Sequence, residues 1–220
     1  MADPLEPDRT GKRTPRFPVA TVLLAAAAVG AWLVPGLAER LEFTRPSIVD
    51  GELWRLLTGH LTHLSLEHLA WDLGVFIVLG ALTERANRAR FLACLGAAAA
   101  TISVAVWWFA PGLAVYRGLS GLDSALFALL VVTVLHEKLA ERRWWSVGAV
   151  AAISAAFAAK LVLEATTSTA VFVSTPGLAP VPLAHAIGAL VGGVLGWSGT
   201  HRRPGAREGA RPKCRETMTT

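Results

Sequence analysis

Charged residues are scarce in this chain of 220 residues, and their scarcity excludes most soluble folds. Asp, Glu, Lys and Arg together make up only 17% of the residues, whereas hydrophobic residues make up 53%. The mean hydropathy is +0.48. A soluble domain needs a polar surface that this composition does not supply. We therefore expect an integral membrane protein.

The sequence has few cysteines and no visible internal repeat. One of the two cysteines, Cys94, lies in an apolar run and the other, Cys214, lies in the C-terminal tail. This separation predicts neither a structural disulfide nor a cysteine metal site. No internal repeat is visible, which argues against the duplicated halves that are common in secondary transporters.

Long apolar runs are what the sequence does contain. Six of them approach the roughly 20 residues that a helix needs to cross a bilayer. They cover residues 17–37, 66–83, 91–110, 119–136, 144–164 and 182–199. We predict an all-α membrane protein in which residues 17–199 form six transmembrane helices. Residues 1–16 and 200–220 are expected to be polar tails.

Basic residues cluster on one side of this topology. Of the 21 Lys and Arg residues, 16 lie before the first run, between the second and third, between the fourth and fifth, or after the sixth. Loops rich in positive charge stay in the cytoplasm, so both termini are predicted to be cytoplasmic. The same rule explains the basic C-terminal tail, and we expect no nucleic acid as a partner.

A hydroxyl and an imidazole stand inside separate apolar runs. Ser120 lies in a Gly-Leu-Ser-Gly sequence at the start of the fourth run, and His185 lies near the start of the sixth. Polar side chains at membrane depth are costly and mark a functional site by default. Both runs begin on the same non-cytoplasmic side, which places the two residues at matching depth. We predict a serine nucleophile and its general base, with no cofactor and no metal.

Small residues accompany both of these side chains. Gly188 and Gly192 fall on the helix face of the predicted base, and Gly118 and Gly121 flank the predicted nucleophile. Small residues at such positions allow two helices to pack closely. We expect these glycines to bring the two helices together at the site.

The second run opens with further polar groups, among them His68 and Asp72, which share a helix face. The Trp-Arg…His…His…Asp stretch, the Gly-Leu-Ser-Gly turn and the Ala-His-x-x-Gly-x-x-x-Gly helix follow one another on six spans. This ordered set, from about residue 52 to residue 197, resembles the rhomboid family of intramembrane serine proteases. The stretch Tyr116–Gly121 together with Asp72 is most similar to the rhombosortases. Those are bacterial relatives that process proteins with a C-terminal Gly-Gly sorting signal and a hydrophobic tail.

The resemblance implies a role for each matching residue. Ser120 would be the nucleophile and His185 the general base of a Ser-His dyad. Backbone N–H groups of Ser120 and Leu119 would stabilise the oxyanion, helped by His68. Asp72 stands where the family usually has Asn, and we expect it to accept a hydrogen bond from His68 and orient that ring. The resemblance also implies membrane-anchored protein substrates and a bacterial inner membrane.

Other polar residues have weaker interpretations. Asp123 lies on the helix face of the predicted nucleophile, where it is either a polar partner of the site or makes a cap-like or interhelical hydrogen bond near the helix start. Lys160 and Glu164 are four residues apart in the fifth run and are interpreted as a helix-face pair or as snorkelling charges, not as catalytic groups. The segments 111–118 and 38–65 are expected to frame a wet cavity, because irregular backbone is tolerated at depth only next to protein or water.

Two other functions remain open. One is a metal-dependent membrane enzyme, since the region around the second run holds several residues of metal-ligand type, although no His-Glu-x-x-His is present. These residues are His60, His63, Glu67, His68 and Asp72. The other is a non-catalytic rhomboid-like protein that binds transmembrane segments. Such relatives usually lack the serine or the histidine, whereas this chain has both.

Overall fold

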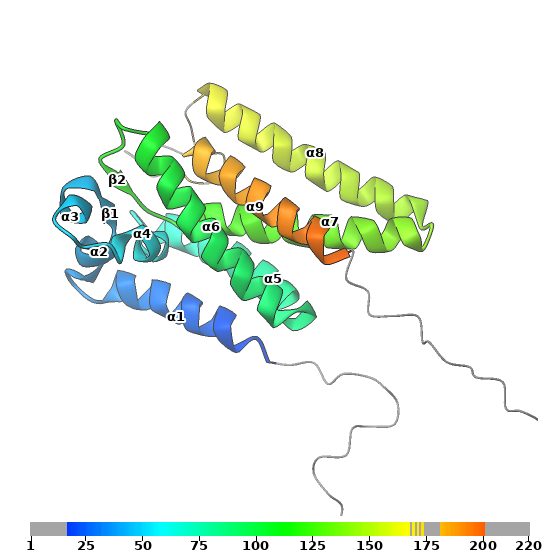
Figure 1. The fold of residues 1–220 in the computed structure, drawn as a ribbon, viewed down its shortest axis with the longest axis horizontal. Coiled ribbons are helices and arrows are strands. Elements are labelled where there is room, and N and C mark those ends of the chain that lie inside the picture. Colours follow the sequence, from blue (N-terminus) through cyan, green and yellow to red (C-terminus); the bar gives the residue numbers. More distant parts are fainter. Residues whose placement is uncertain (1–16, 168, 170, 172, 174–180, 201–220) are drawn as a thin grey trace, which may run out of the picture.

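Six long helices form the body of the protein (Figure 1). The computed structural model describes residues 17–200 apart from 168, 170, 172 and 174–180. The predicted tail at 1–16 and all of the predicted tail at 200–220 except Thr200 lie outside the described residues. The helices are α1 (Val19–Leu33), α5 (Leu66–Ala86), α6 (Arg88–Phe109), α7 (Ser120–Ala140), α8 (Trp144–Thr167) and α9 (Pro182–Thr200). Each coincides with one predicted apolar run, so a helix is present in each of the six runs, as predicted.

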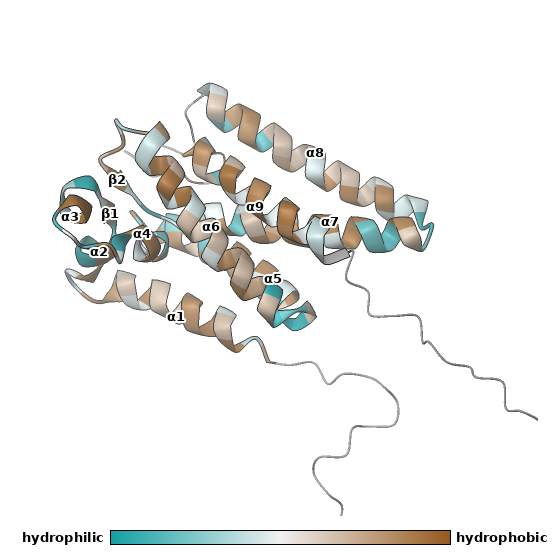
Figure 2. Cartoon of the chain, viewed as in Figure 1, coloured by the Kyte–Doolittle hydropathy of each residue, from teal (hydrophilic) through white to brown (hydrophobic). Residues whose placement is uncertain are grey.

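Apolar residues follow the long helices, and hydrophilic residues gather near several of their ends (Figure 2). By length and composition, three of the described helices can cross a membrane, namely α5, α6 and α8. Helices α1 and α9 are apolar but shorter, and α7 is not among the three. The number of spans therefore stays a prediction.

The region between α1 and α5 forms a cap at one end of the bundle (Figure 1). It consists of α2 (Leu37–Leu41), β1 (Phe43–Thr44), α3 (Arg45–Val49), α4 (Arg55–Thr58) and the 3₁₀ turn η1 (Gly59–Leu61). Strand β1 pairs antiparallel with β2 (Val115–Tyr116), which precedes α7. This short ladder departs from the all-α prediction, and it ties the segment that leads into α7 to the cap.

Local capping sets the start of the helices that carry polar residues. Helix α5 begins at Leu66 because the Ser65 side chain accepts a hydrogen bond from the N–H of His68 at 3.1 Å. Asn87 separates α5 from α6 and caps α6 in the same way, accepting the N–H of Arg90 at 3.0 Å. The Ser65 cap fixes which residues of α5 lie in its first turns, and the Asn87 cap does the same for α6.

Helix α7 occupies the centre of the bundle, where it packs against α5, α6, α8 and α9. Residues 121–126, in its first two turns, are all buried. Helix α9 lies alongside α7 with its start at the same end of the bundle, and α8 lies at the outer edge (Figure 1). The first turns of α7 and α9 are therefore neighbours.

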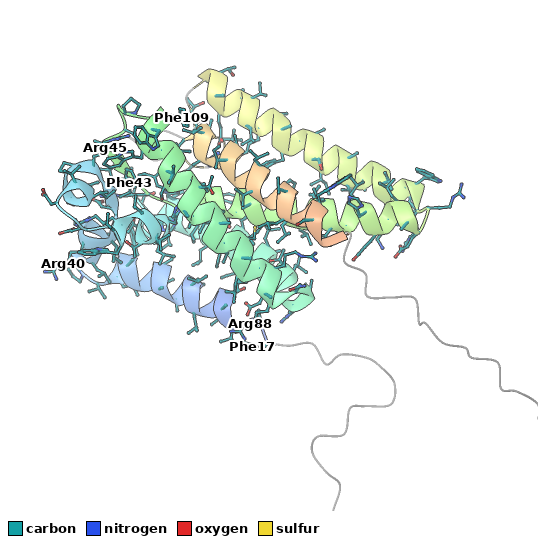
Figure 3. The ribbon with its side chains drawn as sticks, in the orientation of Figure 1. Phe17, Arg40, Phe43, Arg45, Arg88 and Phe109 are labelled. Carbon is teal, nitrogen blue, oxygen red and sulfur yellow. The ribbon has the colours of Figure 1, made fainter. Side chains whose placement is uncertain are left out.

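The basic clusters among the described residues lie at one end of the bundle. Figure 3 shows Phe17 and Arg88 at the end where α1 begins, and Arg40, Arg45 and Phe109 at the opposite end, near the cap. The α7–α8 junction lies at the Arg88 end as well (Figure 1). The described basic clusters thus share one end, as the predicted topology requires, and which end faces the cytoplasm remains a prediction.

Candidate active site

Ser120 and His185 lie in contact although 65 residues separate them. Ser120 is the first residue of α7, and His185 lies in the first turn of α9. The Nε2 atom of His185 is 3.0 Å from Oγ of Ser120, which is hydrogen-bond distance. The structure therefore brings together the two residues that the sequence singled out.

Glycines allow α7 and α9 to approach this closely. A Cβ atom on Gly188 would overlap the carbonyl oxygen of Gly121, and one on Gly192 would overlap that of Ala125. Gly121 lies at the same contact through its carbonyl oxygen, while a Cβ atom on it would come within 2.9 Å of Cδ1 of Ile102 in α6. These three glycines lie at the helix contact as predicted, and a side chain on Gly188 or Gly192 would push the two helices apart.

Gly118 has a different place from the one predicted. It lies in the segment before α7 instead of on a helix face, and its φ of +114° is a conformation that side chains disfavour. A Cβ atom there would come within 2.9 Å of Nε2 of His68 and 3.1 Å of Oδ2 of Asp72. Gly118 thus shapes the turn into α7 and leaves room for polar residues of α5, so its assignment to helix packing was wrong.

Asp72 is the shared acceptor of a polar cluster beside this turn. Its Oδ2 atom lies 3.2 Å from Nε2 of His68 and 3.4 Å from Nε2 of His63, so the expected proximity of Asp72 and His68 is present. The same oxygen accepts the backbone N–H of Ser120 at 3.1 Å. That N–H is the predicted oxyanion donor, and a substrate oxygen can use it only after Asp72 releases it. Leu119, whose N–H was the second candidate donor, is fully buried at the N-cap of α7.

A cavity of about 210 Å³ opens beside the Ser120–His185 pair. Near the pair its wall is polar, and along α5, α7 and α8 it is apolar. The apolar part is formed by Trp71, Val75, Leu79, Phe127 and Phe157. Tyr116 and Arg117 line it from the 111–118 segment, as expected. No residue of the segment 38–65 lines the cavity, so the prediction that this segment helps to frame it was wrong.

Asp123 belongs to the wall of this cavity. It is buried, and its Oδ1 atom has no hydrogen-bond partner within the described part of the chain. Oδ1 therefore caps no described helix. This placement favours the interpretation of Asp123 as a polar partner of the site.

The sequence analysis missed Glu164. This residue is only 3% exposed, and its Oε2 atom lies 3.1 Å from Nδ1 of His185 and 2.9 Å from Nζ of Lys160. The Lys160–Glu164 pair was predicted, but the contact with His185 was not. The signal was present, because an acidic residue inside an apolar run marks a site by the same rule that singled out Ser120 and His185.

The five residues of metal-ligand type do not form a metal site, although His63, His68 and Asp72 lie together. His60 turns into the core, where its Nε2 atom lies 3.1 Å from the carbonyl oxygen of Ala99 and 3.2 Å from Oγ of Ser103. Among the described residues, no group of three or more His, Cys, Asp or Glu side chains is arranged to hold a metal ion. The metal-dependent alternative is therefore not favoured.

Comparison with known protein families matches residues 50–202 to the Rhomboid domain. The match covers more than half of the chain and includes both Ser120 and His185. The chain belongs to the rhomboid family. It is therefore an integral membrane protein with a helical bundle fold, and at the family level this membership supports a serine-type intramembrane protease.

One rhomboid relative is a protein of Bacillus subtilis (strain 168) that is named "Putative rhomboid protease YdcA". It is 30% identical to this chain over an alignment of 128 residues, and the match covers 54% of this chain and 64% of that protein. The match thus spans somewhat less than two thirds of the relative's length. Neither comparison favours a scaffold without activity.

Proposed function

We propose that this rhomboid protein is an intramembrane serine endopeptidase that cleaves membrane-tethered proteins, with Ser120 as nucleophile and His185 as general base. The observation that carries the proposal is the 3.0 Å contact between Oγ and Nε2 at the wall of the cavity. A hydroxyl needs an adjacent base to attack a peptide bond, and this pair supplies both groups at one place.

The chemistry follows from this contact. Oγ of Ser120 attacks the scissile carbonyl carbon while its proton passes to Nε2 of His185. The tetrahedral intermediate collapses, the C–N bond breaks, and His185 returns the proton to the leaving amine. A water molecule, activated by the same ring, then hydrolyses the acyl-enzyme ester and restores the serine.

The shape of the cavity supports a hydrophobic protein segment as substrate. Its apolar wall runs along α5, α7 and α8, whereas its polar end lies beside the Ser120–His185 pair. Apolar side chains of a substrate segment can pack against the first part, and its unwound backbone can find hydrogen-bond partners at the second, which exposed peptide groups require.

The proposal is tested by cleavage of a membrane-tethered reporter. We expect cleavage by the unmodified protein and none by Ser120→Ala or His185→Ala at equal abundance. Ser154→Ala in α8 and His136→Ala at the far end of α7 are matched controls that should cleave normally. Cleavage by either site variant at the normal rate would refute the assignment.

For the substrate class, we propose a rhombosortase-like specificity in a bacterial inner membrane, with the Ser120 end of the bundle facing away from the cytoplasm. The motif of residues 116–121 together with Asp72 supports it. The test compares a reporter that ends in Gly-Gly, an apolar helix and a few arginines with one in which Leu-Leu replaces Gly-Gly. The proposal predicts at least about tenfold faster cleavage of the first, and equal rates would contradict it.

A further inference from the structure

The outermost long helix buries one residue, and that residue is an acid. Among the described residues of α8, Glu164 alone is buried. A carboxylate withdrawn from water is unfavourable unless charges and hydrogen-bond donors surround it. The groups around Glu164 therefore indicate why it lies there.

Three groups face this carboxylate from different parts of the chain. Oε1 accepts the backbone N–H of Val171 at 3.3 Å. Oε2 accepts a hydrogen bond from Nζ of Lys160 at 2.9 Å and lies 3.1 Å from Nδ1 of His185. The amide and the ammonium can only donate, and the nearby ammonium favours the ionised carboxylate, which can only accept. The ring nitrogen that faces Glu164 is therefore the one expected to carry hydrogen.

This arrangement determines the chemistry of the other ring nitrogen. A neutral imidazole carries one N–H, so a hydrogen on Nδ1 leaves a lone pair on Nε2. That lone pair faces Oγ of Ser120 at 3.0 Å. We infer that Glu164 is a positioning residue, which holds His185 in the tautomer and orientation of a general base and stabilises its charged form. This inference rests on the proposed Ser120–His185 chemistry.

The two atoms Nδ1 of His185 and Oε2 of Glu164 are close, but their geometry is not that of a well-aligned hydrogen bond. Nδ1 of His185 makes no well-directed hydrogen bond in the structure, although Oε2 of Glu164 is near. Catalytic hydrogen bonds are often poorly aligned before substrate binds and tighten in the transition state. When the proton of Ser120 passes to His185, the ring becomes positively charged, and its attraction to the carboxylate of Glu164 increases.

Other charged groups face the same space and must be considered in any pH experiment. From α8, Lys160 shares an oxygen of Glu164 with the imidazole. From α7, Asp123 lines the cavity, and from α5, His68 and Asp72 do so. Arg117 lines it from the segment before α7. Glu164 is the acidic residue that lies at ion-pair distance from Nδ1 of His185, at 3.1 Å.

The experiment compares Glu164→Gln, Glu164→Asp and the exposed acid variant Glu141→Gln by reporter cleavage in membranes across a range of pH. We expect Glu164→Gln to lower kcat at least about 30-fold with KM changed less than about threefold, since Asp→Asn in the Ser-His-Asp triad lowers kcat about 10⁴-fold. The fall of kcat/KM at low pH, where His185 becomes protonated, should also move to lower pH. The reason is that the protonated ring of His185 has lost the carboxylate that stabilises its charge. Glu164→Asp should recover most of kcat, and Glu141→Gln should equal the unmodified protein.

The outcomes separate this inference from the function on which it rests. If Glu164→Gln is folded and keeps the normal kcat and pH profile while Ser120→Ala is inactive, Glu164 does not position the base, and the proposed function stands. If the unmodified protein cleaves nothing, the proposed function fails first. Should Glu164→Gln not fold, Glu164→Asp decides: a normal acid limb with most of kcat retained supports positioning, and a kcat as low as that of His185→Ala overturns it.

Discussion

Gly192 of α9 faces the carbonyl oxygen of Ala125 in α7 so closely that no Cβ atom fits between them. The next residue, Gly193, points elsewhere, and a Cβ atom there would meet nothing within 4 Å. Of these two adjacent glycines, Gly192 lies at the contact between α7 and α9 that brings His185 to Ser120, and Gly193 does not.

We expect Gly192→Ala to push α9 away from α7 and to lower both the unfolding temperature and cleavage. Overpacking of this kind typically costs about 1–3 kcal/mol. Gly193→Ala should leave both properties unchanged or slightly improve stability, since alanine favours helix. Thermal unfolding in detergent and reporter cleavage measure the two effects. Equal behaviour of the two variants would show that this contact does not hold the site together.

Asp72 competes with the substrate for a hydrogen-bond donor. Its Oδ2 atom accepts the backbone N–H of Ser120, and an oxyanion must take that N–H over next to a negative charge. We expect Asp72→Asn to raise kcat a few-fold, because the amide removes the charge, can donate to the oxyanion and still accepts from His68. Steady-state cleavage kinetics measure it. A fall in kcat to the level of Ser120→Ala would show that the carboxylate charge itself is needed.

His60 should make the fold sensitive to acid. Burial lowers the pKa of His60 from 6.5 to about 4, and the carbonyl of Ala99 only partly opposes this. Because the unfolded chain binds the proton first, the free energy of unfolding falls as the pH drops from about 6.5 to about 4. The effect amounts to roughly 3 kcal/mol, at about 1.4 kcal/mol per pKa unit. Unfolding measured from pH 7 to pH 4 should show a smaller fall for His60→Gln than for the unmodified protein, and parallel curves would contradict this.

Glu84 fastens the end of α5 to the start of α1. Its carboxylate accepts the N–H of Ala20 at 3.0 Å, the N–H of Thr21 at 2.8 Å and the hydroxyl of Thr21 at 2.8 Å. Glu84→Gln replaces one acceptor oxygen with an NH₂ group, which points its hydrogens at the N–H and hydroxyl donors of α1. We expect the free energy of unfolding to fall by about 2 kcal/mol, which thermal unfolding measures. The neighbouring exposed residue supplies the control, since Arg85→Gln should change little. Equal stability of the two variants would contradict the role given to Glu84.

The long helices could be predicted because each is a long apolar run. The Ser120–His185 contact could be predicted because both residues begin their runs from the same side. The cap could not, because its strand and short helices depend on distant partners, as the pairing of Phe43 with Tyr116 shows. The contact of Glu164 with His185 was missed because the spacing of Lys160 and Glu164 suggested a local pair and the rest of α8 is apolar on every face. Such a sequence does not reveal which face of the helix turns inward.

The most direct test of the central claim is the site of covalent labelling by a serine-directed fluorophosphonate probe in native membranes, located by mass spectrometry. The Ser120–His185 assignment predicts one adduct on Ser120 that disappears in His185→Ala. An adduct on Ser124 instead, or undiminished labelling of Ser120 in His185→Ala, would contradict it.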